Sequence, residues 1–537
     1  MQLRSPGWLI GLGLAALWFA AASIYPLIEP DEARYAEIPR EMAASGDWVT
    51  PRLDGLQYFE KPPLQYWATA ALYKVFGVRE WTARTWPLGL AFLCLPLTFV
   101  WVRRRHGAAA GFAALSLLAA SPFFTIMGHL NLLDAGLTFW LTATVFAFAF
   151  AQDSPAGSKA ERNSMLVAWI AAALAVLSKG IVVPVLAGLT LIGYSLIYRD
   201  WRPWRRLHLL AGLPLFLLIA VPWFIAVSVR NPGFARFFFL HEHFERFLTT
   251  VHRHGEPWWF FLPIAALATL PWLATLPGAL QRAARASPAE SGFHSSGFLL
   301  VYCGVVLGFF SLSQSKLAPY ILPMMPPLAA LAGIHIGASG SPLHRAGWIA
   351  AAGVTLTAAG LVVYALHRYD AAPPSLLLWV SLALLAAMIA ALNITPRAAP
   401  PRNALWLAAG SILAWQCLMV AHGTPPLERS ARSLVAAVRP QIIPHTVLYH
   451  VGQYRQSVPV YLQRTVTLVG YQGELEFGQG QEPGVNATTL EQFKTRWRAD
   501  TDAVAFFEPA IWSTLTREGF PGRVIGADRY SQVVSRR

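Results

Sequence analysis

The residues best suited to chemistry follow the first apolar segment, in the run Glu29-Pro-Asp-Glu-Ala-Arg-Tyr-Ala-Glu37. Pro30 ends the apolar segment, and Asp31 can then cap or open a new helix. On that helix Arg34 and Tyr35 fall three and four residues after Asp31, on its face. A carboxylate, a guanidinium and a phenol would therefore project together. The alternative is an interfacial helix with an ordinary cap.

A second run, from Tyr58 to Trp67, places Glu60 and Lys61 directly before Pro62 and Pro63. Two prolines suit the start of a helix, and the N-terminus of a helix favours an anion. Lys61 could therefore contact a lipid phosphate, and Glu60 could act as a metal ligand or a base. The alternative is a lysine that reaches the headgroup layer without a further role.

Three more polar residues adjoin apolar segments. Asp134 follows Asn131 at the mouth of an apolar helix, where an ionisable group is costly and usually faces a cavity. Lys316 lies between two apolar blocks, and Tyr320 opens the second block, which several prolines will distort. A helix cap at Asp134 and a simple turn at Lys316 are the alternatives.

The segment 229–256 contains four histidines with acids and arginines between them, including His241 and Arg246. Such a composition suits metal or phosphate chemistry. His241 and His243 would point to opposite faces of a helix, so both could not bind one metal without a break in it. The spacing matches no zinc-finger or zinc-protease pattern. A solvated polar loop is the alternative.

The composition places these residues in a membrane protein. The chain has 537 residues, of which 55% are hydrophobic and only 13% charged. A soluble domain carries about 25% charged residues. The net charge of +14 sits largely in short loops between apolar segments. The positive-inside rule explains this excess better than nucleic-acid binding does.

The apolar blocks predict about thirteen membrane helices, since each block approaches the roughly 20 residues that cross a bilayer. Pro-containing blocks make the number uncertain by one or two. The predicted spans lie near 7–27, 82–101, 108–122, 134–151, 165–178, 180–198, 207–228, 257–280, 295–312, 318–338, 346–366, 375–392 and 404–421.

Basic loops predict the orientation of these helices. The arginines at 103–105, 199–206, 282–285 and 397–402 share one side of the membrane if the N-terminus is cytoplasmic. The segments 28–81, 123–133 and 229–256 then face the opposite side. An odd number of helices places the tail, 422–537, on that outer side too.

The tail differs from the rest of the chain. Short β-like runs at 446–451 and 465–469 alternate with Gly, Gln and Glu, which predicts a small soluble α/β domain. The region 1–421 is then a transmembrane domain. Neither part contains a glycine-rich phosphate loop or a dinucleotide fingerprint, so no nucleotide cofactor is expected.

The runs PDEARYAEIPREM, EKPPLQYW, HEHFERF and SKLAPYILPMMPPLA resemble the bacterial lipid A aminoarabinose transferases, the ArnT group. That group belongs to the protein-mannosyltransferase-like superfamily of GT-C membrane glycosyltransferases. The resemblance extends to about residue 340, with a similar layout of later helices and tail. The first run is typical of the superfamily, and the third and fourth favour the ArnT group.

The resemblance implies a donor, an acceptor and a place. The donor would be undecaprenyl phosphate carrying 4-amino-4-deoxy-L-arabinose, and the acceptor a lipid A phosphate. The reaction would occur at the periplasmic face of the bacterial inner membrane, among membrane lipids. No nucleotide sugar would be needed.

The resemblance also implies roles for individual residues. Asp31 and Asp134 would be the catalytic acids. Glu60 and His241 match positions that can hold a divalent metal such as Zn, Mg or Mn. The residues that would contact the donor phosphate are Arg34, Lys61 and Arg246. Tyr35, Lys316 and Tyr320 are further candidates for substrate binding, on the motifs above.

Three other functions stay open. A related transferase could use another sugar or a protein hydroxyl, and Asp31 would then have to be a base. A transporter of lipid-linked sugars would need polar residues through the membrane midplane, whereas the polar residues here gather on one side. A scaffold whose tail binds a partner would leave the outer acids and cations without a role.

Overall fold

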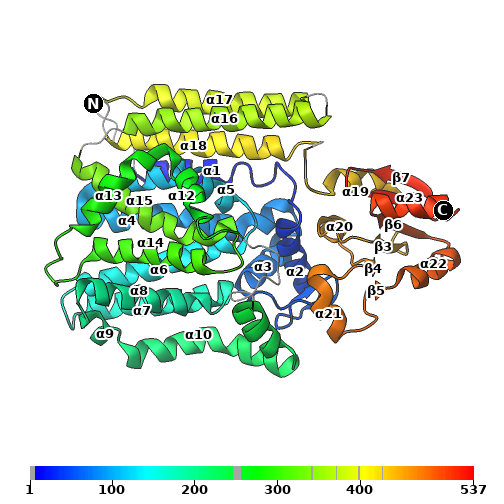
Figure 1. Ribbon diagram of the computed structural model, residues 1–537, viewed down its shortest axis with the longest axis horizontal. Helices are drawn as coiled ribbons and strands as arrows, with labels where there is room; N and C mark the ends of the chain where they lie inside the picture. Colours follow the sequence, from blue (N-terminus) through cyan, green and yellow to red (C-terminus); the bar gives the residue numbers. More distant parts are fainter. Residues whose placement is uncertain (1–6, 246–255, 340–342, 370–371, 397–399, 426) are drawn as a thin grey trace. The chain divides into compact units, whose positions relative to one another are not determined.

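The computed structural model describes residues 7–245, 256–339, 343–369, 372–396, 400–425 and 427–537. These residues fold into two compact units, whose elements are labelled in Figure 1. The helical unit joins Met1–Tyr25, Arg84–Ala226 and Ala235–Pro426. The mixed unit joins Pro26–Ala83, Val227–Phe234 and Leu427–Arg537. The first long loop therefore folds with the tail, although most of the chain lies between them.

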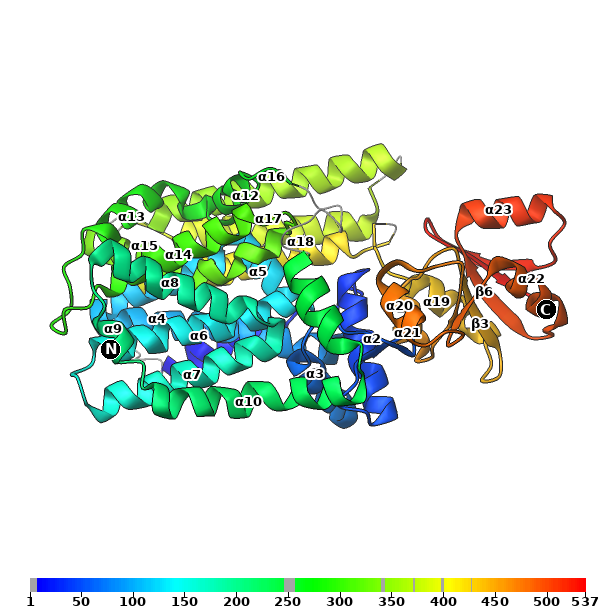
Figure 2. The same cartoon turned by 60° about the horizontal axis from the view of Figure 1, so that its bottom comes forward.

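The helical unit is a bundle of apolar helices. Its first half contains α1 (Gly7–Phe19), α4 (Glu80–Ala120), α5 (Pro122–His129), α6 (Leu133–Asp153), α7 (Lys159–Lys179), α8 (Val182–Tyr198), α9 (Arg202–Arg205) and α10 (Leu209–Arg230). Its second half contains η1 (Arg236–Glu245), α12 (Phe261–Ala268), η2 (Leu270–Thr275), α13 (Leu276–Ala284), α14 (Ser295–Leu312), η3 (Ala318–Met324), α15 (Met325–Ser339), α16 (Leu343–Tyr369), α17 (Pro374–Asn393) and α18 (Pro400–His422). Helices α6, α7 and α8 lie side by side, as do α16, α17 and α18 (Figure 2).

The length and apolar composition of these helices confirm a polytopic membrane protein. Within the described ranges, nine helices are long and apolar enough to cross a bilayer, or ten if a bent pair forms one span. This number is below the thirteen expected for two reasons. The 41-residue α4 counts once, although Gly107 breaks it at φ +83°, and α1 and α8 fall short of a full span.

One predicted span has a different shape. A single helix was expected over 257–280, but α12 and the η2–α13 segment meet at a bend of 87°. Pro271 and Pro277 lie at the first turns of η2 and α13, where proline is tolerated because no helical hydrogen bond is lost. The two halves therefore form a broken span or a re-entrant loop.

Small residues let two central helices approach closely. A Cβ added at Gly333 of α15 would lie 2.5 Å from the Cβ of Ala114 on α4, and one at Gly337 would lie 2.6 Å from the Cβ of Ala110. The two glycines on α15 are four residues apart, and so are the two alanines on α4, as in the small-xxx-small pattern of membrane helices. Larger residues at these glycines would force α4 and α15 apart.

The mixed unit begins with the first loop. Its elements are α2 (Asp31–Ser45), β1 (Arg52–Leu53), β2 (Leu56–Gln57) and α3 (Leu64–Phe76). The two short strands pair as an antiparallel hairpin around Asp54 and Gly55, which both have positive φ. Asp-Gly is the preferred sequence for such a two-residue turn.

The tail forms an α/β domain, as the sequence predicted, and its sheet has six strands. Its strands are β3 (Val447–Val451), β4 (Thr467–Val469), β5 (Ala487–Thr488), β6 (Ala503–Phe507), β7 (Arg523–Ala527) and β8 (Gln532–Ser535), in the order β5-β4-β3-β6-β8-β7. The first four strands of that order run parallel. Strand β8 pairs antiparallel with β6, and β7 pairs antiparallel with β8, so β8 alone among the six runs in the opposite direction.

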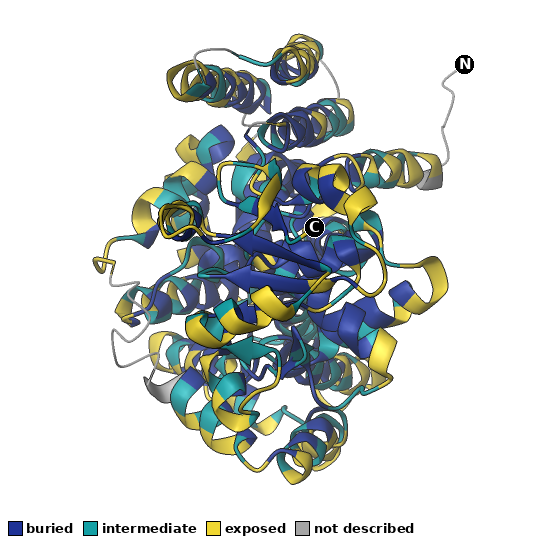
Figure 3. Ribbon diagram, turned by 90° about the vertical axis from the view of Figure 1, so that its right-hand side faces the viewer, coloured by how far each residue is buried: buried dark blue, intermediate teal, exposed yellow. Residues whose placement is uncertain are grey.

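Helices on the sheet complete the domain. They are α19 (Arg432–Val438), α20 (Ser457–Leu462), α21 (Glu476–Gln481), α22 (Leu490–Ala499) and α23 (Pro509–Arg517). Every residue of β6 is buried, and Phe507 of this strand forms part of the core with Phe493 and Trp497. The ribbon in Figure 3 shows buried strands in dark blue. A near-continuous apolar strand is typical of a sheet covered on both faces.

Candidate functional site

The carboxylate of Asp31 lies at the start of α2, as the sequence predicted. Pro30 occupies the N-cap position without a side-chain cap, so Asp31 is the first helical residue rather than the cap. The Asp31 side chain is 53% exposed, and its Oδ1 lies 3.6 Å from Nη1 of Arg34. Asp31 and Arg34 therefore share one face of α2, and the carboxylate stays open to solvent.

Arg34 is nearly buried among acceptors from other parts of the mixed unit. Its Nη1 donates to the hydroxyl of Tyr58 at 3.3 Å, and its Nη2 donates to Glu474 Oε2 at 3.4 Å. Its guanidinium also lies 5.9 Å from the centre of the Tyr35 ring. The two hydrogen bonds are longer than typical charge-assisted hydrogen bonds, which are usually about 2.7–2.9 Å. The guanidinium is thus held in place with bonding capacity left over.

Glu60 and Lys61 belong to the same neighbourhood. Lys61 Nζ lies 3.9 Å from Glu60 Oε2 and donates to the backbone oxygen of Glu60 at 2.9 Å. Helix α3 begins at Leu64 after Pro63, as the two prolines predicted. Burial raises the pKa of the Tyr66 hydroxyl, and the charge of Glu60 raises it further. The Tyr66 ring lies 6.3 Å from the ring of Tyr35, measured between ring centres. The group of Arg34, Tyr35, Tyr58, Glu60, Lys61 and Tyr66 is called the Arg34 cluster below.

Glu474 is a member of this cluster that the sequence reasoning missed. It comes from the tail, where Gln456 Nε2 donates to its Oε1 at 2.7 Å. Burial raises the pKa of Glu474, and the positive charge of Arg34 opposes that rise. No local pattern pointed to Glu474, because it is 440 residues from its partner.

A second polar cluster lies in the helical unit. Asp134, in the first turn of α6, forms a short ion pair with Lys179 at the end of α7. Lys179 Nζ also lies 4.9 Å from the centre of the Tyr320 ring. Lys179 was not predicted; its signal was a lone lysine directly before Gly180 at the end of an apolar helix. The structure thus joins Asp134 and Tyr320 through Lys179.

Lys316 is buried beside a turn. Its Nζ donates to the backbone oxygens of Ser313 at 2.5 Å and Glu256 at 2.8 Å. Two carbonyls therefore hold this ammonium group in a fixed position. Its predicted contact with substrate stays a prediction.

The predicted metal ligands form no recognisable centre. Within the described ranges, no three side chains of His, Cys, Asp or Glu lie close enough to hold a metal ion. His241 lies in η1, which is a π-helix, and its ring stacks on Phe237 at 5.3 Å. Arg246 and the following histidines lie outside the described residues. A metal at Glu60 and His241 therefore stays a prediction.

The first loop is tied to the tail beside the catalytic candidate. Glu29, two residues before Asp31, accepts hydrogen bonds from Arg455 Nε at 3.1 Å and from the hydroxyl of Ser457. Near the other end of the loop, Glu80 accepts from Tyr461 at 2.7 Å and pairs with Arg432 at 3.2 Å. The tail therefore fixes both ends of the segment that carries Asp31, Arg34 and Lys61.

Fold and site together define a polytopic membrane protein with an α/β tail and a buried cluster of cation, phenol and carboxylate groups. Two family models match the chain. Residues 13–238 match dolichyl-phosphate-mannose-protein mannosyltransferase, and residues 434–536 match the aminoarabinose transferase C-terminal domain.

A comparison with solved structures identifies the family within this class of membrane protein. A solved structure, ArnT from Cupriavidus metallidurans bound to undecaprenyl phosphate, is 32% identical, with a TM-score of 0.88 over 99% of both chains. The chain therefore belongs to the ArnT family.

Sequence relatives of the same family match a shorter region of the chain. Undecaprenyl phosphate-alpha-4-amino-4-deoxy-L-arabinose arabinosyl transferases from Sodalis glossinidius and Pseudomonas paraeruginosa are 38% and 37% identical over 60% and 62% of the chain. These matches span 58% and 60% of the relatives' own lengths.

Proposed function

We propose that this chain is a glycosyltransferase that moves 4-amino-4-deoxy-L-arabinose from undecaprenyl phosphate to a phosphate of lipid A. The carrying observation is the likeness, over 99% of both chains, to an ArnT whose structure contains undecaprenyl phosphate. The Arg34 cluster adds chemical support. A buried arginine with long contacts suits a phosphate that arrives with the substrate.

The proposed reaction exchanges one phosphate for another at the sugar. The bond between the anomeric carbon and the donor phosphate oxygen breaks, and that oxygen keeps the electron pair. An oxygen of the acceptor phosphate supplies the pair for the new bond. Because this nucleophile is already an anion, a strong general base is unnecessary.

The residues take roles that follow from charge. Arg34, Lys61 and Arg246 would stabilise the phosphate that leaves with the polyprenyl chain. Asp31, which is open to solvent, would lie near the anomeric carbon, where positive charge develops. Asp134, which forms an ion pair with Lys179, would be the second catalytic acid. Tyr35, Lys316 and Tyr320 would line the substrate sites.

Orientation is part of the proposal. The arginine-rich loops would face the cytoplasm, and the first loop and the tail would face the periplasm of an inner membrane. A reporter fused after Arg537 that is active only outside the cytoplasm would support this orientation. Activity only in the cytoplasm would contradict it.

A divalent metal at Glu60 and His241 is a further part of the proposal. A carboxylate and an imidazole suit Zn, Mg or Mn, and a bound ion would supply positive charge beside the phosphates. Transfer that falls on treatment with a chelator and returns with one of these ions would support the site. Undiminished transfer after chelation would exclude a required metal.

A reconstituted assay tests the transferase proposal. Liposomes would contain the purified chain, the undecaprenyl-phosphate-linked sugar, and lipid A and a protein acceptor in parallel. Mass spectrometry should show the sugar on lipid A phosphate only. Sugar on the protein would favour a second candidate function, a related transferase that uses a protein hydroxyl as acceptor. The match to the mannosyltransferase family model supports this candidate. Flipping of the donor without transfer to either acceptor would favour a transporter.

A further inference from the structure

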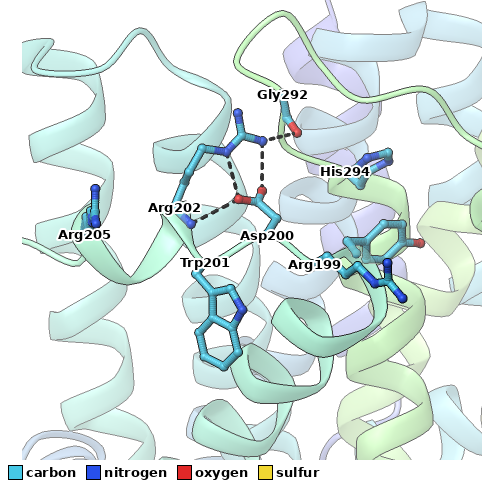
Figure 4. A pocket seen from close by; sticks show the side chains of 8 residues that line it. Arg199, Asp200, Trp201, Arg202, Arg205, Gly292 and His294 are labelled. Carbon is cyan, nitrogen blue, oxygen red and sulfur yellow. Dashed lines mark hydrogen bonds and ion pairs between the residues drawn. The ribbon is translucent and has the colours of Figure 1, made fainter.

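A pocket of about 480 Å³ opens in the helical unit between the end of α8 and the loop before α14. Its lining includes Arg199, Asp200, Arg202, Arg205 and His294 (Figure 4). Its volume falls in the range of ordinary small-ligand sites, which is about 300–1,000 Å³. None of these residues belongs to the clusters described above.

The pocket lies at the opposite end of the bundle from Asp134. Helix α6 begins beside Asp134 and ends at Asp153 after 21 residues, a length of about 30 Å at 1.5 Å per residue. Asp153 accepts a hydrogen bond from Ser295, which directly follows His294 of the pocket. The hydrocarbon core of a bilayer is about 30 Å thick, so the pocket and Asp134 lie at opposite membrane surfaces.

The pocket has unused positive charge. The Arg202 guanidinium already has acceptors within the protein. Its Nε donates to Asp200 Oδ1 at 2.8 Å, and its Nη2 donates to the backbone oxygen of Gly292 at 2.9 Å. Figure 4 shows Arg199 and Arg205 on either side of this pair. Neither arginine has an ion pair or side-chain hydrogen bond among the described residues. Three guanidinium groups and one carboxylate therefore line the pocket.

Arg199 also has an unusual backbone conformation. It ends α8 at φ +51° and ψ +35°, in the left-handed region that glycine and asparagine adopt most easily. An arginine at this position costs some backbone energy. This turn therefore carries an arginine at a position where glycine is the usual residue.

Exposed apolar side chains lie in the pocket and on the helices before and after it in the chain. Ile197 is 66% exposed on the last turn of α8, Trp201 is 55% exposed in the pocket, and Leu210 is 98% exposed at the start of α10. Tryptophan is typical of the membrane–water interface. A soluble anion would use only the arginines, whereas a lipid would contact both kinds of side chain.

We propose that this pocket binds the phosphodiester headgroup of an anionic glycerophospholipid. Arg199 and Arg205 would contact the phosphate, Trp201 would lie at the glycerol level, and the acyl chains would follow the exposed apolar residues of α8 and α10. Because the arginine-rich loop at 199–206 would face the cytoplasm, this lipid would belong to the cytoplasmic leaflet. The site is separate from the proposed transfer reaction and does not depend on it.

The test compares two double variants of the full-length chain in detergent. Arg199→Asn with Arg205→Gln removes the two unpaired charges, and asparagine tolerates the left-handed backbone. Arg162→Gln with Arg345→Gln is the control, because both arginines are exposed, lack a described ion pair and lie outside the pocket. Native mass spectrometry would measure the binding of phosphatidylglycerol, phosphatidylcholine with the same chains, and glycerol 3-phosphate.

Wild type and control should bind phosphatidylglycerol, and the pocket variant should bind it about 25-fold more weakly, at about fivefold per arginine. Phosphatidylcholine should bind weakly to all three proteins. Equal binding of phosphatidylglycerol by the pocket variant would overturn the proposal. Binding of glycerol 3-phosphate as strong as that of the lipid would identify a soluble-anion site instead. Unchanged thermal melting of the variant would show that its fold is intact.

Discussion

Arg455 and Arg34 are two buried arginines of the mixed unit that lie at different distances from their acidic partners. Arg455 is 4% exposed at its side chain and lies between two carboxylates, with Nε 3.1 Å from Glu29 and Nη1 2.5 Å from Asp528. Its guanidinium also lies 5.3 Å from the ring of Tyr530. Short contacts to two acids from distant segments are typical of a group that stabilises the fold.

The contacts of Arg34 are longer. Its three polar partners, Asp31, Tyr58 and Glu474, lie at 3.6, 3.3 and 3.4 Å. Each arginine has one nitrogen without an acceptor among the described residues, Nε in Arg34 and Nη2 in Arg455. The difference therefore lies in the contact lengths and in the exposed Asp31 beside Arg34. On this comparison Arg455 belongs to the scaffold, and Arg34 keeps its proposed role in binding the donor phosphate.

The largest expected effect is on stability, in Arg455→Ala. Removing one partner of a buried ion pair leaves its acids uncompensated, which typically costs about 3–5 kcal/mol. Thermal unfolding in detergent should therefore occur at a clearly lower temperature. Arg498→Ala, at an exposed arginine of the same domain, should unfold like wild type. An unchanged unfolding temperature in Arg455→Ala would remove Arg455 from the scaffold.

Asp31→Asn should abolish most transfer without destabilising the chain. Asparagine keeps the size of the side chain, and Asp31 does not occupy the N-cap position. Loss of a positioned carboxylate typically lowers a rate by about 100-fold or more. Lipid A modification in liposomes would measure the rate, with thermal unfolding recorded alongside. Near-wild-type transfer would move the main catalytic role to Asp134.

Arg34→Ala should weaken donor binding and leave the fold intact. Charge-assisted hydrogen bonds of this kind contribute about 1.5–3 kcal/mol, which corresponds to roughly 10- to 150-fold in affinity. Binding of radiolabelled undecaprenyl phosphate would measure the loss. Arg79→Ala, at an exposed arginine of the same loop, is the matched control. Adding Arg246→Ala should weaken binding further, and normal binding by that double variant would rule out the phosphate site.

The smallest expected effect is a pH dependence of stability that comes from Glu474. Burial raises its pKa in the folded chain despite the charge of Arg34, so the folded state holds this proton more tightly than the unfolded state. The stabilisation is therefore fully present below the unfolded pKa and is lost as pH rises through the folded pKa.

Glu474→Gln should remove that part of the pH dependence. Thermal unfolding of both proteins between about pH 4 and 8 would show the wild type losing stability relative to the variant as pH rises. The opposite slope would mean that Arg34 holds Glu474 ionised, and Arg34 would then resemble Arg455.

Local sequence predicted the elements better than their partners. Pro30 and Pro63 indicated where α2 and α3 begin, because proline acts on its own backbone and on the residue before it. The bend of 87° between α12 and η2–α13 was not predicted. A proline at a first turn permits a new helix without fixing its direction, which depends on packing.

The sequence by itself determined that this chain spans a membrane repeatedly, ends in an α/β domain and places Asp31 and Arg34 on one helical face. These features depend on composition and on spacings of a few residues. Only the tertiary structure decided that Glu474 meets Arg34 and that Arg455 meets Glu29, across 440 and 426 residues. Such pairs leave no periodic signal, because burial and closure of a long loop select the partner rather than local backbone geometry.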